Sequence, residues 1–475
     1  MKEKLVETIT SRTDDFAQWY TDLCLKAELM DYSDAKGFII YRPTGYGIWE
    51  NIQKYLDDKF KKTNHENVYM PMVISESLFQ KEKDHVDGFA PETAFMTTKN
   101  QDENEEKLII RPTSEVLFCQ HYAKIVSSYR DLPKKYNQWC SVVRWEKTTR
   151  PFLRGKEFLW QEGHTIHSTE AEAKKETLDM LGIYKDLGKD LLAIPFVTGR
   201  KTEKEKFAGA LETYAIEALM HDGKALQSGT SHYFGQGFAK AFDIKYQDKD
   251  SKIKHVYQTS WGVSTRLIGA VIMVHGDDEG LVLPPYLAPT QIIIIPIQQN
   301  KEIVKEATEQ VYNDLTEAGY RVKIDDSNKS PGWKFSEYEM KGIPVRIEIG
   351  PRDLEQGTVL ITTRHDRNKQ SIKLDELVSK LPAILKDMHD TLYENALKHV
   401  EEHTYTAKTY DEFKTLIEDG GYIKMSISGE DAELIIKQDT AATARVILTE
   451  EPLITELCPV TNKNATQTVL FARAY

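Results

Sequence analysis

The sequence predicts three domains of mixed helix and strand: an α+β domain, an α/β domain and a small third unit. The chain has 475 residues, long enough for roughly three domains at about 150 residues each. Helical and strand patterns mix up to Pro284 and Pro285, a pair that neither a helix nor a central strand can continue through. A strand–helix–strand pattern begins at Gln291, so we expect domains at 1–285, 286–390 and 391–475.

Composition and charge exclude several classes of protein. The chain carries 62 Lys and Arg against 74 Asp and Glu, a formal charge of -12, which argues against a surface that binds nucleic acid indiscriminately. Its longest apolar runs fall far below the roughly 18 residues of a membrane span, and no signal peptide is visible. Four cysteines without a CxxC pair exclude a disulfide framework and a four-cysteine zinc site. We therefore expect a cytoplasmic protein with no membrane partner.

The first domain contains an amphipathic helix followed by a strand-like segment. Apolar residues recur at helical spacing at Ile48, Ile52, Leu56 and Phe60, and the sequence VYMPMVI, which contains Pro71, follows them. Taken alone, this pattern is typical of an ordinary helix packed on a sheet.

The segment 142–167 carries the most chemistry. It reads as strand, polar loop and strand, and alternation places two aromatic rings, a carboxylate and an imidazole on one face, namely Phe158, Trp160, Glu162 and His164. Arg144 and Glu146 are expected to share a face of the preceding strand. Burying such charges costs several kcal/mol each unless they are paired. The pattern therefore indicates either a buried ion-pair network or, as we favour, a pocket for a small charged ligand.

A basic loop joins these two strands. Residues 147–156 include four Lys and Arg and no acid. The loop is either a solvated turn or a cover for polyphosphate, whose oxygens guanidinium groups bind in bidentate fashion. Because the chain has neither a GxxxxGK[ST] loop nor a GxGxxG turn after a strand, a nucleotide would have to be held in another way.

The α/β domain is predicted from periodicity. Ile292–Ile295 is typical of a buried parallel strand, residues 301–318 have helical spacing, and 320–324 alternate as a strand. Two further strands are expected at Val345–Ile349 and 358–362.

Together these motifs resemble class II aminoacyl-tRNA synthetases, and specifically the prolyl-tRNA synthetase family of the archaeal and eukaryotic-like type. Residues 46–74, 144–158 and 262–266 resemble the three class II motifs in order. Further signatures match at 111–115, 160–164, 227–232, 258–262 and 471–475. The resemblance implies a catalytic α+β domain with an antiparallel sheet, an α/β anticodon-binding domain and a small α+β C-terminal domain. It also implies a homodimer that attaches L-proline to tRNA(Pro) in translation through a prolyl-adenylate, using ATP and Mg²⁺.

The resemblance also implies roles for individual residues. Arg144 would bridge the carboxylate of proline and the α-phosphate of ATP, and Arg144 and Arg266 are the residues expected to act on the reacting groups. The remaining ATP contacts implied are Glu146, Arg154, Phe158, Gln227, Thr230, Ser264 and Arg266, with Gln227 also near Mg²⁺. The proline contacts implied are Phe89, Thr113, Glu115, Arg144, Trp160, Glu162, His164, His232 and Ser260. Glu339, Arg346 and Arg352 would reach the anticodon.

Two features of the family are missing from this chain. Only Cys458 remains where the family often has four zinc-binding cysteines, so we expect no zinc and a C-terminal unit that seats Ala474 and Tyr475 against the first domain. The segment between the second and third motifs is too short for the large editing insertion of the bacterial type. We therefore expect measurable activation of alanine without clearance by the same chain.

Two alternatives remain open at this stage. A related synthetase would activate another amino acid, such as threonine, but the zinc-binding Cys and His set expected there is not visible. A catalytically silent, tRNA-binding paralogue would not need Arg144, Glu115 and Arg266.

Overall fold

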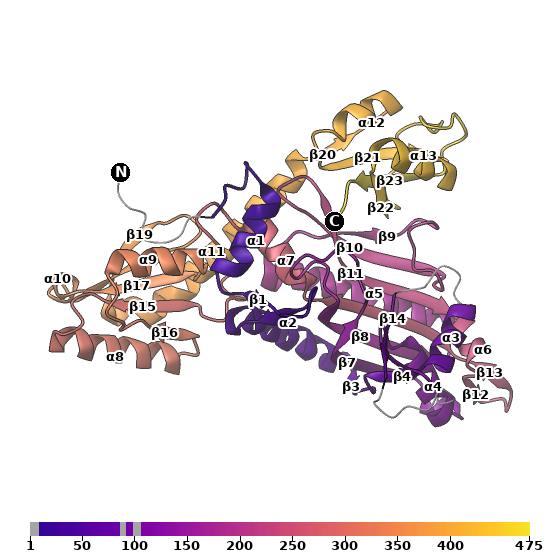
Figure 1. Ribbon diagram of the computed structural model, residues 1–475, viewed down its shortest axis with the longest axis horizontal. Helices are drawn as coiled ribbons and strands as arrows, with labels where there is room; N and C mark the ends of the chain where they lie inside the picture. The colour runs from indigo at the N-terminus through magenta and orange to yellow at the C-terminus, as the bar shows by residue number, and fades with distance from the viewer. Residues whose placement is uncertain (1–8, 86–91, 98–105) are drawn as a thin grey trace.

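The computed structural model describes residues 9–85, 92–97 and 106–475. Figure 1 shows the N-terminal domain at the centre and right, the α/β domain at the left, and the C-terminal domain above the central sheet. Among the described residues, no helix is long and apolar enough to cross a membrane.

The N-terminal domain combines helices with a large antiparallel sheet. Its helices are α1 (Phe16–Lys26), α2 (Pro43–Lys62), α3 (Glu76–His85), α4 (Glu115–Ile125), α5 (Glu170–Leu187), α6 (Gly237–Ala241) and α7 (Arg266–His275). Its strands are β1 (Met30–Tyr32), β2 (Ile39–Tyr41), β3 (Glu66–Asn67), β4 (Val73–Ser75), β5 (Ala94–Met96), β6 (Leu108–Ile110), β7 (Lys134–Val143), β8 (Glu157–His167), β9 (Val197–Arg200), β10 (Glu212–Leu219), β11 (Ala225–Gly235), β12 (Lys245–Gln247), β13 (Ile253–His255) and β14 (Tyr257–Ser264).

The central sheet is antiparallel from β9 through β7, in the order β9-β10-β11-β14-β8-β7, as predicted. Helix α5 packs along one face of β10, β11, β14 and β8. This packing is tight at Gly163, where an added Cβ would lie 2.1 Å from the indole of Trp261, so only glycine fits there. The other face of the same strands is open and carries the pocket described below.

The amphipathic helix predicted in the first domain is α2, which begins with Pro43 at its first turn and buries Ile48, Ile52, Leu56 and Phe60. The strand-like segment that follows is interrupted, because β3 ends at Asn67 and β4 begins at Val73. Pro71 has no N–H for a sheet ladder.

The α/β domain contains β15 (Ile292–Pro296), α8 (Glu302–Glu317), β16 (Val322–Ile324), α9 (Pro331–Met340), β17 (Val345–Ile349), α10 (Pro351–Leu354), β18 (Thr358–Thr363) and β19 (Lys369–Lys373). Its sheet has the order β16-β15-β17-β18-β19, with β16, β15 and β17 parallel and the other pairs antiparallel. The predicted strand–helix–strand unit is therefore present. Arg364 joins this domain to the first through two hydrogen bonds of 2.9 and 2.6 Å to Asp277.

The long helix α11 (Leu377–Glu402) connects the α/β domain to the C-terminal domain and spans the expected boundary at 390. The C-terminal domain contains β20 (Thr404–Thr406), α12 (Tyr410–Leu416), β21 (Tyr422–Ile427), α13 (Glu430–Thr440), β22 (Thr443–Ile447) and β23 (Gln467–Ala472). Its strands continue the central sheet, because Ile447 of β22 pairs with Arg200 of β9. At the chain end, the N–H of Tyr475 donates to the carbonyl of Ala225 at 3.1 Å.

Candidate active site

A pocket of about 360 Å³ opens on the face of the central sheet opposite α5. Its walls include most of the residues that the sequence singled out: Thr113, Glu115, Arg144, Phe158, Trp160, Glu162, His164, Gln227, Thr230, His232, Ser260, Ser264 and Arg266. They come from β8, β11, β14, the start of α4 and α7, and the residue after β7. The volume lies within the range of small-molecule sites.

Strand register places polar side chains in a row across the pocket floor. His164 of β8 pairs with Ser260 of β14, Ser260 pairs with His232 of β11, and His232 pairs with Thr213 of β10. Directly paired residues in antiparallel strands point to the same face. The row therefore follows from alternation once the register is known.

Glu162 and His164 form a buried pair at one end of the pocket. The imidazole Nε2 of His164 lies 2.9 Å from Oε2 of Glu162, and the side-chain amide of Gln138 donates to Oε1 at 2.6 Å. Burial alone would raise the pKa of Glu162, but the hydrogen bond and charge of His164, followed by bonds from Ser114 and Gln138, hold it below its usual value. This end therefore presents a buried carboxylate that suits an ammonium group.

Aromatic walls flank this carboxylate. The indole N–H of Trp160 donates to the sulfur of Cys140 at 3.2 Å, which fixes the indole plane. The ring of His164 stacks on Phe118 with centroids 4.2 Å apart. These flat surfaces suit a compact ring better than a flexible chain.

Arg144 lies between the two ends of the pocket. Its guanidinium carbon is 5.5 Å from the ring centroid of Phe158 and 5.4 Å from that of Trp160, and its Nε donates to the carbonyl of Pro112 at 3.1 Å. Cation–π contact with both rings aims the guanidinium along the pocket. The sequence expectation that Arg144 shares a strand face with Glu146 is wrong, since β7 ends at Val143.

Positive charge gathers at the other end. Arg266, the first residue of α7, donates to the carbonyls of Leu153 and Gln227, each at 3.2 Å. Burial, and then the charges of Arg144 and Arg154, lower the pKa of Arg266 to about 10. Crowded guanidinium groups repel one another, and an anion placed among them would relieve that repulsion. This end of the pocket therefore suits a polyphosphate.

His232 sits deep in the pocket as a neutral imidazole. Burial, and then the nearby His164, lower its pKa to about 3. Its Nδ1 lies 2.9 Å from Oγ1 of Thr213. Thr113 donates a hydrogen bond to Glu115, so these two residues at the start of α4 act together at the rim.

Among the described residues, two of the expected ATP contacts do not line this pocket. Glu146 and Arg154 lie on the loop after β7, where Arg154 Nη1 is 3.8 Å from Glu146 Oε2, and Arg154 lines a neighbouring cavity of about 380 Å³. Phe89 lies outside the described residues.

Several further residues contribute to the site without a signal in the local sequence pattern. Glu205, Phe207 and Thr213 also line the pocket, and Gln138 and Cys140 support Glu162 and Trp160 from β7. Gln138 pairs directly with Glu162 and Cys140 with Trp160. Pairing the two alternating strands would have revealed both.

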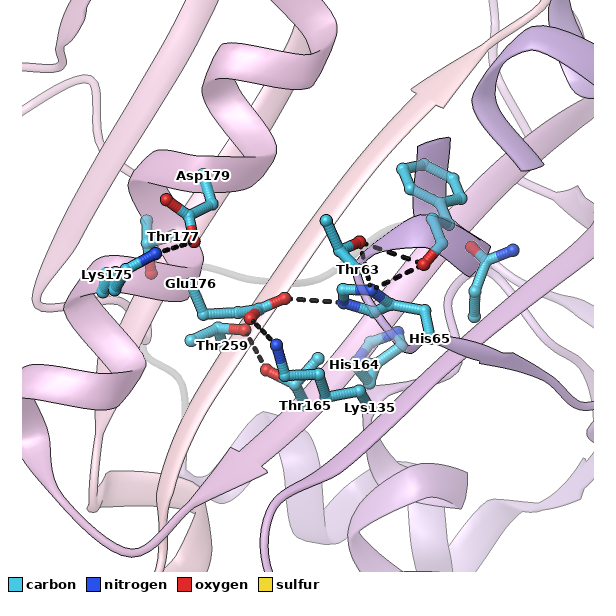
Figure 2. Close-up of polar contacts among 12 residues, drawn as sticks. Thr63, His65, Lys135, His164, Thr165, Lys175, Glu176, Thr177, Asp179 and Thr259 are labelled. Atoms are coloured by element: carbon cyan, nitrogen blue, oxygen red, sulfur yellow. Dashed lines mark hydrogen bonds and ion pairs between the residues drawn. The ribbon is translucent and has the colours of Figure 1, made fainter. Parts of the chain in front are cut away.

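The reverse face of the same strands holds a second polar cluster, drawn in Figure 2. Glu176 of α5 contacts His65 and Lys135, while Thr165 of β8 contacts Thr259 of β14. Because side chains alternate, these residues face α5 and not the pocket.

The expected anticodon residues lie in the α/β domain. Arg346 Nη1 is 3.5 Å from Oε1 of Glu339, and its Nε donates to Glu348 at 3.1 Å. The guanidinium also stacks on Phe335 at 4.0 Å. Arg352 is exposed on α10 and is not part of this cluster.

No group of three or more His, Cys, Asp or Glu that could hold a metal is found among the described residues. In the C-terminal domain, the loops where the family often holds zinc are joined by a hydrogen bond of 2.8 Å between the hydroxyls of Ser428 and Thr461. Cys458 is buried beside them as a free thiol.

Comparison with known proteins identifies the family. A profile described as tRNA synthetase class II core domain (G, H, P, S and T) matches residues 95–275, an anticodon binding domain profile matches 291–384, and a prolyl-tRNA synthetase C-terminal profile matches 410–475. The chain is 63% identical over 472 residues to the proline–tRNA ligase of Phytoplasma australiense, with 99% of each chain covered. It is 58% identical over 476 residues to that of Clostridium novyi, covering 100% of this chain and 99% of the relative.

The chain belongs to the proline–tRNA ligase family. The class II architecture predicted from the sequence is thereby confirmed, and the pocket lies within the segment matched by the class II core profile. Both relatives are bacterial proteins, so close similarity to this chain is not confined to archaea and eukaryotes.

Proposed function

We propose that this proline–tRNA ligase family member attaches L-proline to tRNA(Pro) with ATP, through a prolyl-adenylate formed in the pocket on the central sheet. One observation carries the proposal. A single cavity holds a buried carboxylate and a flat indole at one end and the guanidinium of Arg266 at the other, with Arg144 between them and the charge of Arg154 nearby. The relatives that share the full length of the chain are named for this reaction.

The proline end would be formed by Thr113, Glu115, Trp160, Glu162, His164, His232 and Ser260, with Phe89 above it. Glu162 accepts from the secondary ammonium, and Trp160 packs against the five-membered ring. The neutral His232 adds no second positive charge beside the ammonium.

The ATP end would be formed by Phe158, which stacks on adenine, together with Glu146, Arg154, Gln227, Thr230, Ser264 and Arg266. Glu146 and Arg154 are close enough to each other to act as one unit when the loop covers the nucleotide. Arg144 contacts both the carboxylate of proline and the α-phosphate, because its guanidinium fork suits either group.

The reaction then needs no nucleophile from the protein. The carboxylate of proline attacks the α-phosphorus and pyrophosphate leaves. A terminal ribose hydroxyl of the tRNA next attacks the prolyl carbonyl and AMP leaves. The protein accelerates both steps by alignment and by placing Arg144 and Arg266 against developing negative charge.

Mg²⁺ would bind together with ATP, and the pocket residues would supply only one or two of its ligands. Mg²⁺ usually keeps several waters and binds phosphate oxygens with one or two protein groups, so the side-chain oxygen of Gln227 is a sufficient contribution. When bound, the ion neutralises phosphate charge. We expect no structural zinc, so a chelator should leave the melting temperature unchanged.

The α/β domain would read the anticodon of tRNA(Pro) through Glu339, Arg346 and Arg352. Arg346 stacks on Phe335 and pairs with Glu339, so its guanidinium is held in a fixed orientation before RNA binds. Arg352 is free to approach the RNA backbone from the surface.

The enzyme would act as a homodimer in the cytoplasm. Large apolar side chains are exposed around the segment that resembles the first class II motif, including Tyr69 at 69% and Met72 at 46%. Sedimentation velocity should give twice the mass of one chain.

ATP–pyrophosphate exchange with each of the twenty amino acids tests the proposal. Exchange with proline, followed by charging of tRNA(Pro), is the expected result. Exchange with threonine alone would instead support a related synthetase. No exchange with any amino acid, in a protein that still binds tRNA, would support a silent paralogue.

A further inference from the structure

Glu217 lies at the centre of a buried charge cluster beside the pocket. Its carboxylate accepts from Lys201 Nζ at 2.6 Å and from Arg445, whose Nε and Nη2 lie 3.1 and 2.8 Å from Oε2. Glu217 is 0% exposed, and the side chains of Lys201 and Arg445 are 2% and 8% exposed. We call these three residues the Glu217 cluster.

The cluster joins two domains. Lys201 follows β9 and Glu217 belongs to β10, both in the N-terminal domain, whereas Arg445 comes from β22 of the C-terminal domain. Figure 1 shows β22 beside β9 at this junction. The two ion-paired residues are 228 positions apart in the sequence.

Both strands are irregular where they bear the paired charges. The register shifts between Ile216 and Glu217 on β10 and between Ala444 and Val446 on β22. Such bulges re-aim side chains and are common beside active sites. Here they turn a carboxylate and a guanidinium toward each other at the domain boundary.

The cluster reaches the pocket through Gln227 and Arg266. Glu217 pairs with Gln227 across β10 and β11, and the carbonyl of Gln227 accepts from Nη1 of Arg266 at 3.2 Å. The charges of Glu217 and Arg445 both act on Arg266, the first raising its pKa and the second lowering it, after the larger effects of burial, Arg144 and Arg154. The cluster therefore lies next to the phosphate end of the pocket.

The cost of burying these charges indicates that the cluster has a role other than stability. Two cations share one carboxylate in a nearly fully buried site, which is costly to form and is often neutral or unfavourable for stability compared with apolar packing. Arg445 binds the carboxylate in bidentate fashion, which fixes its orientation more firmly than a point charge would. A rigid Glu217 in turn fixes the strand pair that holds Arg266.

We propose that Arg445 is a positioning residue for amino-acid activation, supplied by the C-terminal domain, and that it holds Arg266 against the phosphates of ATP through Glu217 and Gln227. This inference rests on the proposed function, in which Arg266 contacts ATP. It gives the C-terminal domain a part in the first step of the reaction, apart from any contact with tRNA.

Three variants test the proposal. Arg445→Met removes the guanidinium group, Arg445→Lys keeps the positive charge without the bidentate geometry, and Glu433→Gln is the matched control. Glu433 makes another buried contact between the same domains, a hydrogen bond of 2.8 Å from Thr202, but it is not among the largest influences on the pKa of Arg266. Melting temperature and circular dichroism report whether each variant is folded.

ATP binding is measured by calorimetry with Mg²⁺–ATP alone, and exchange kinetics are measured over a range of ATP and of proline. For Arg445→Met we expect the Kd and KM for ATP to rise by about tenfold or more, because a small misplacement of a catalytic group is costly. The KM for proline should change less than twofold, well below the tenfold change that corresponds to about 1.4 kcal/mol. Arg445→Lys should recover part of the loss, and Glu433→Gln should leave both constants unchanged.

The outcomes separate the two proposals. The positioning role is refuted if Arg445→Met binds ATP as the wild type does, or if it weakens the binding of ATP and the binding of proline equally. This holds whatever the melting temperature of the variant. If Arg445→Met does not fold, the same criteria apply to Arg445→Lys. A wild type that binds ATP but exchanges with no amino acid contradicts the proposed function, whereas the effect of Arg445 on ATP binding is still decided by calorimetry.

Discussion

The imidazole Nε2 of His65 lies 2.6 Å from Oε1 of Glu176, beneath the strands that form the pocket floor (Figure 2). Lys135 Nζ lies 2.5 Å from the other oxygen of the same carboxylate. Burial alone would raise the pKa of Glu176, but the hydrogen bond and charge of His65, followed by those of Lys135, lower it to about 2. The Glu176 carboxylate therefore links helix α5 to strand β7 and to the segment after α2, on the face of the sheet opposite the pocket.

The depressed pKa of Glu176 predicts an acid-sensitive contribution to stability. Because the folded value is about 2 and the usual value is 4.5, the contribution is complete above pH 4.5 and is lost as the pH falls toward 2. Glu176→Gln should destabilise the domain by about 3 kcal/mol at pH 7, since it leaves buried partners unpaired. The gap between the melting temperatures of the two proteins should be smaller at pH 3 than at pH 7, and it should close only as the pH approaches 2.

The control for this variant lies one residue away. Lys175 pairs with Asp179 on the exposed side of the same helix (Figure 2), where such pairs contribute about 0–1 kcal/mol. Lys175→Gln should therefore barely change the melting temperature. An equal gap between Glu176→Gln and wild type at both pH values would show that its ionisation does not stabilise the fold.

Removal of the Glu162 charge should weaken the binding of proline but not that of ATP. Glu162→Gln keeps the shape but places an amide against the donors of Gln138 and His164, so we expect the KM for proline to rise by about 100-fold with little change for ATP. Exchange kinetics measure both constants. Glu157→Gln, at the exposed start of the same strand, is the control. An unchanged KM for proline would place the ammonium elsewhere.

Replacement of Arg144 by lysine should impair amino-acid activation. Its guanidinium contacts the rings of Phe158 and Trp160 at once, and an ammonium cannot match this planar stacking or bind two oxygens in parallel. We expect Arg144→Lys to lower the exchange rate by about 100-fold, comparable to the loss of a transition-state donor. Arg130→Lys, which alters a surface cation stacked on Tyr129 at 5.1 Å, should have no effect. Near-normal exchange by Arg144→Lys would exclude a bidentate role.

Alanine should be activated and retained. Each methylene missing from a substrate changes binding by only about 1–3 kcal/mol, so a pocket shaped for proline cannot reject alanine completely. Residues 168–256 form α5, α6 and β9–β13, all elements of the N-terminal domain, and include no separate editing domain. Exchange with alanine should be measurable, and alanyl-tRNA(Pro) should persist with purified enzyme. Rapid deacylation by the wild type would contradict this prediction.

Local periodicity was sufficient to predict part of the site. The alternation of Trp160, Glu162 and His164 on one face holds because a regular strand has a side-chain period of two. The same rule failed at Arg144 and Glu146, where β7 has already ended, and at Pro71, which interrupts the ladder. Periodicity describes a strand but does not mark its last residue.

Contacts between distant segments could not be predicted in this way. Gln138 is placed under Glu162 by the register of β7 and β8, which the sequence does not state. The bond from Arg445 to Glu217 depends further on two bulges and on a domain junction. Such pairs follow from three-dimensional packing and leave no spacing signal in one chain.

The pairing of β22 with β9 has a consequence for shortened versions of the enzyme. Because Ile447 pairs with Arg200, the C-terminal domain lies against β9, which would otherwise be the edge strand of the catalytic sheet. Cutting the chain after α11 would leave β9 paired with β10 alone and would expose its other edge, and an exposed edge strand is a template for self-association. A truncated protein is therefore expected to self-associate more readily than the full chain.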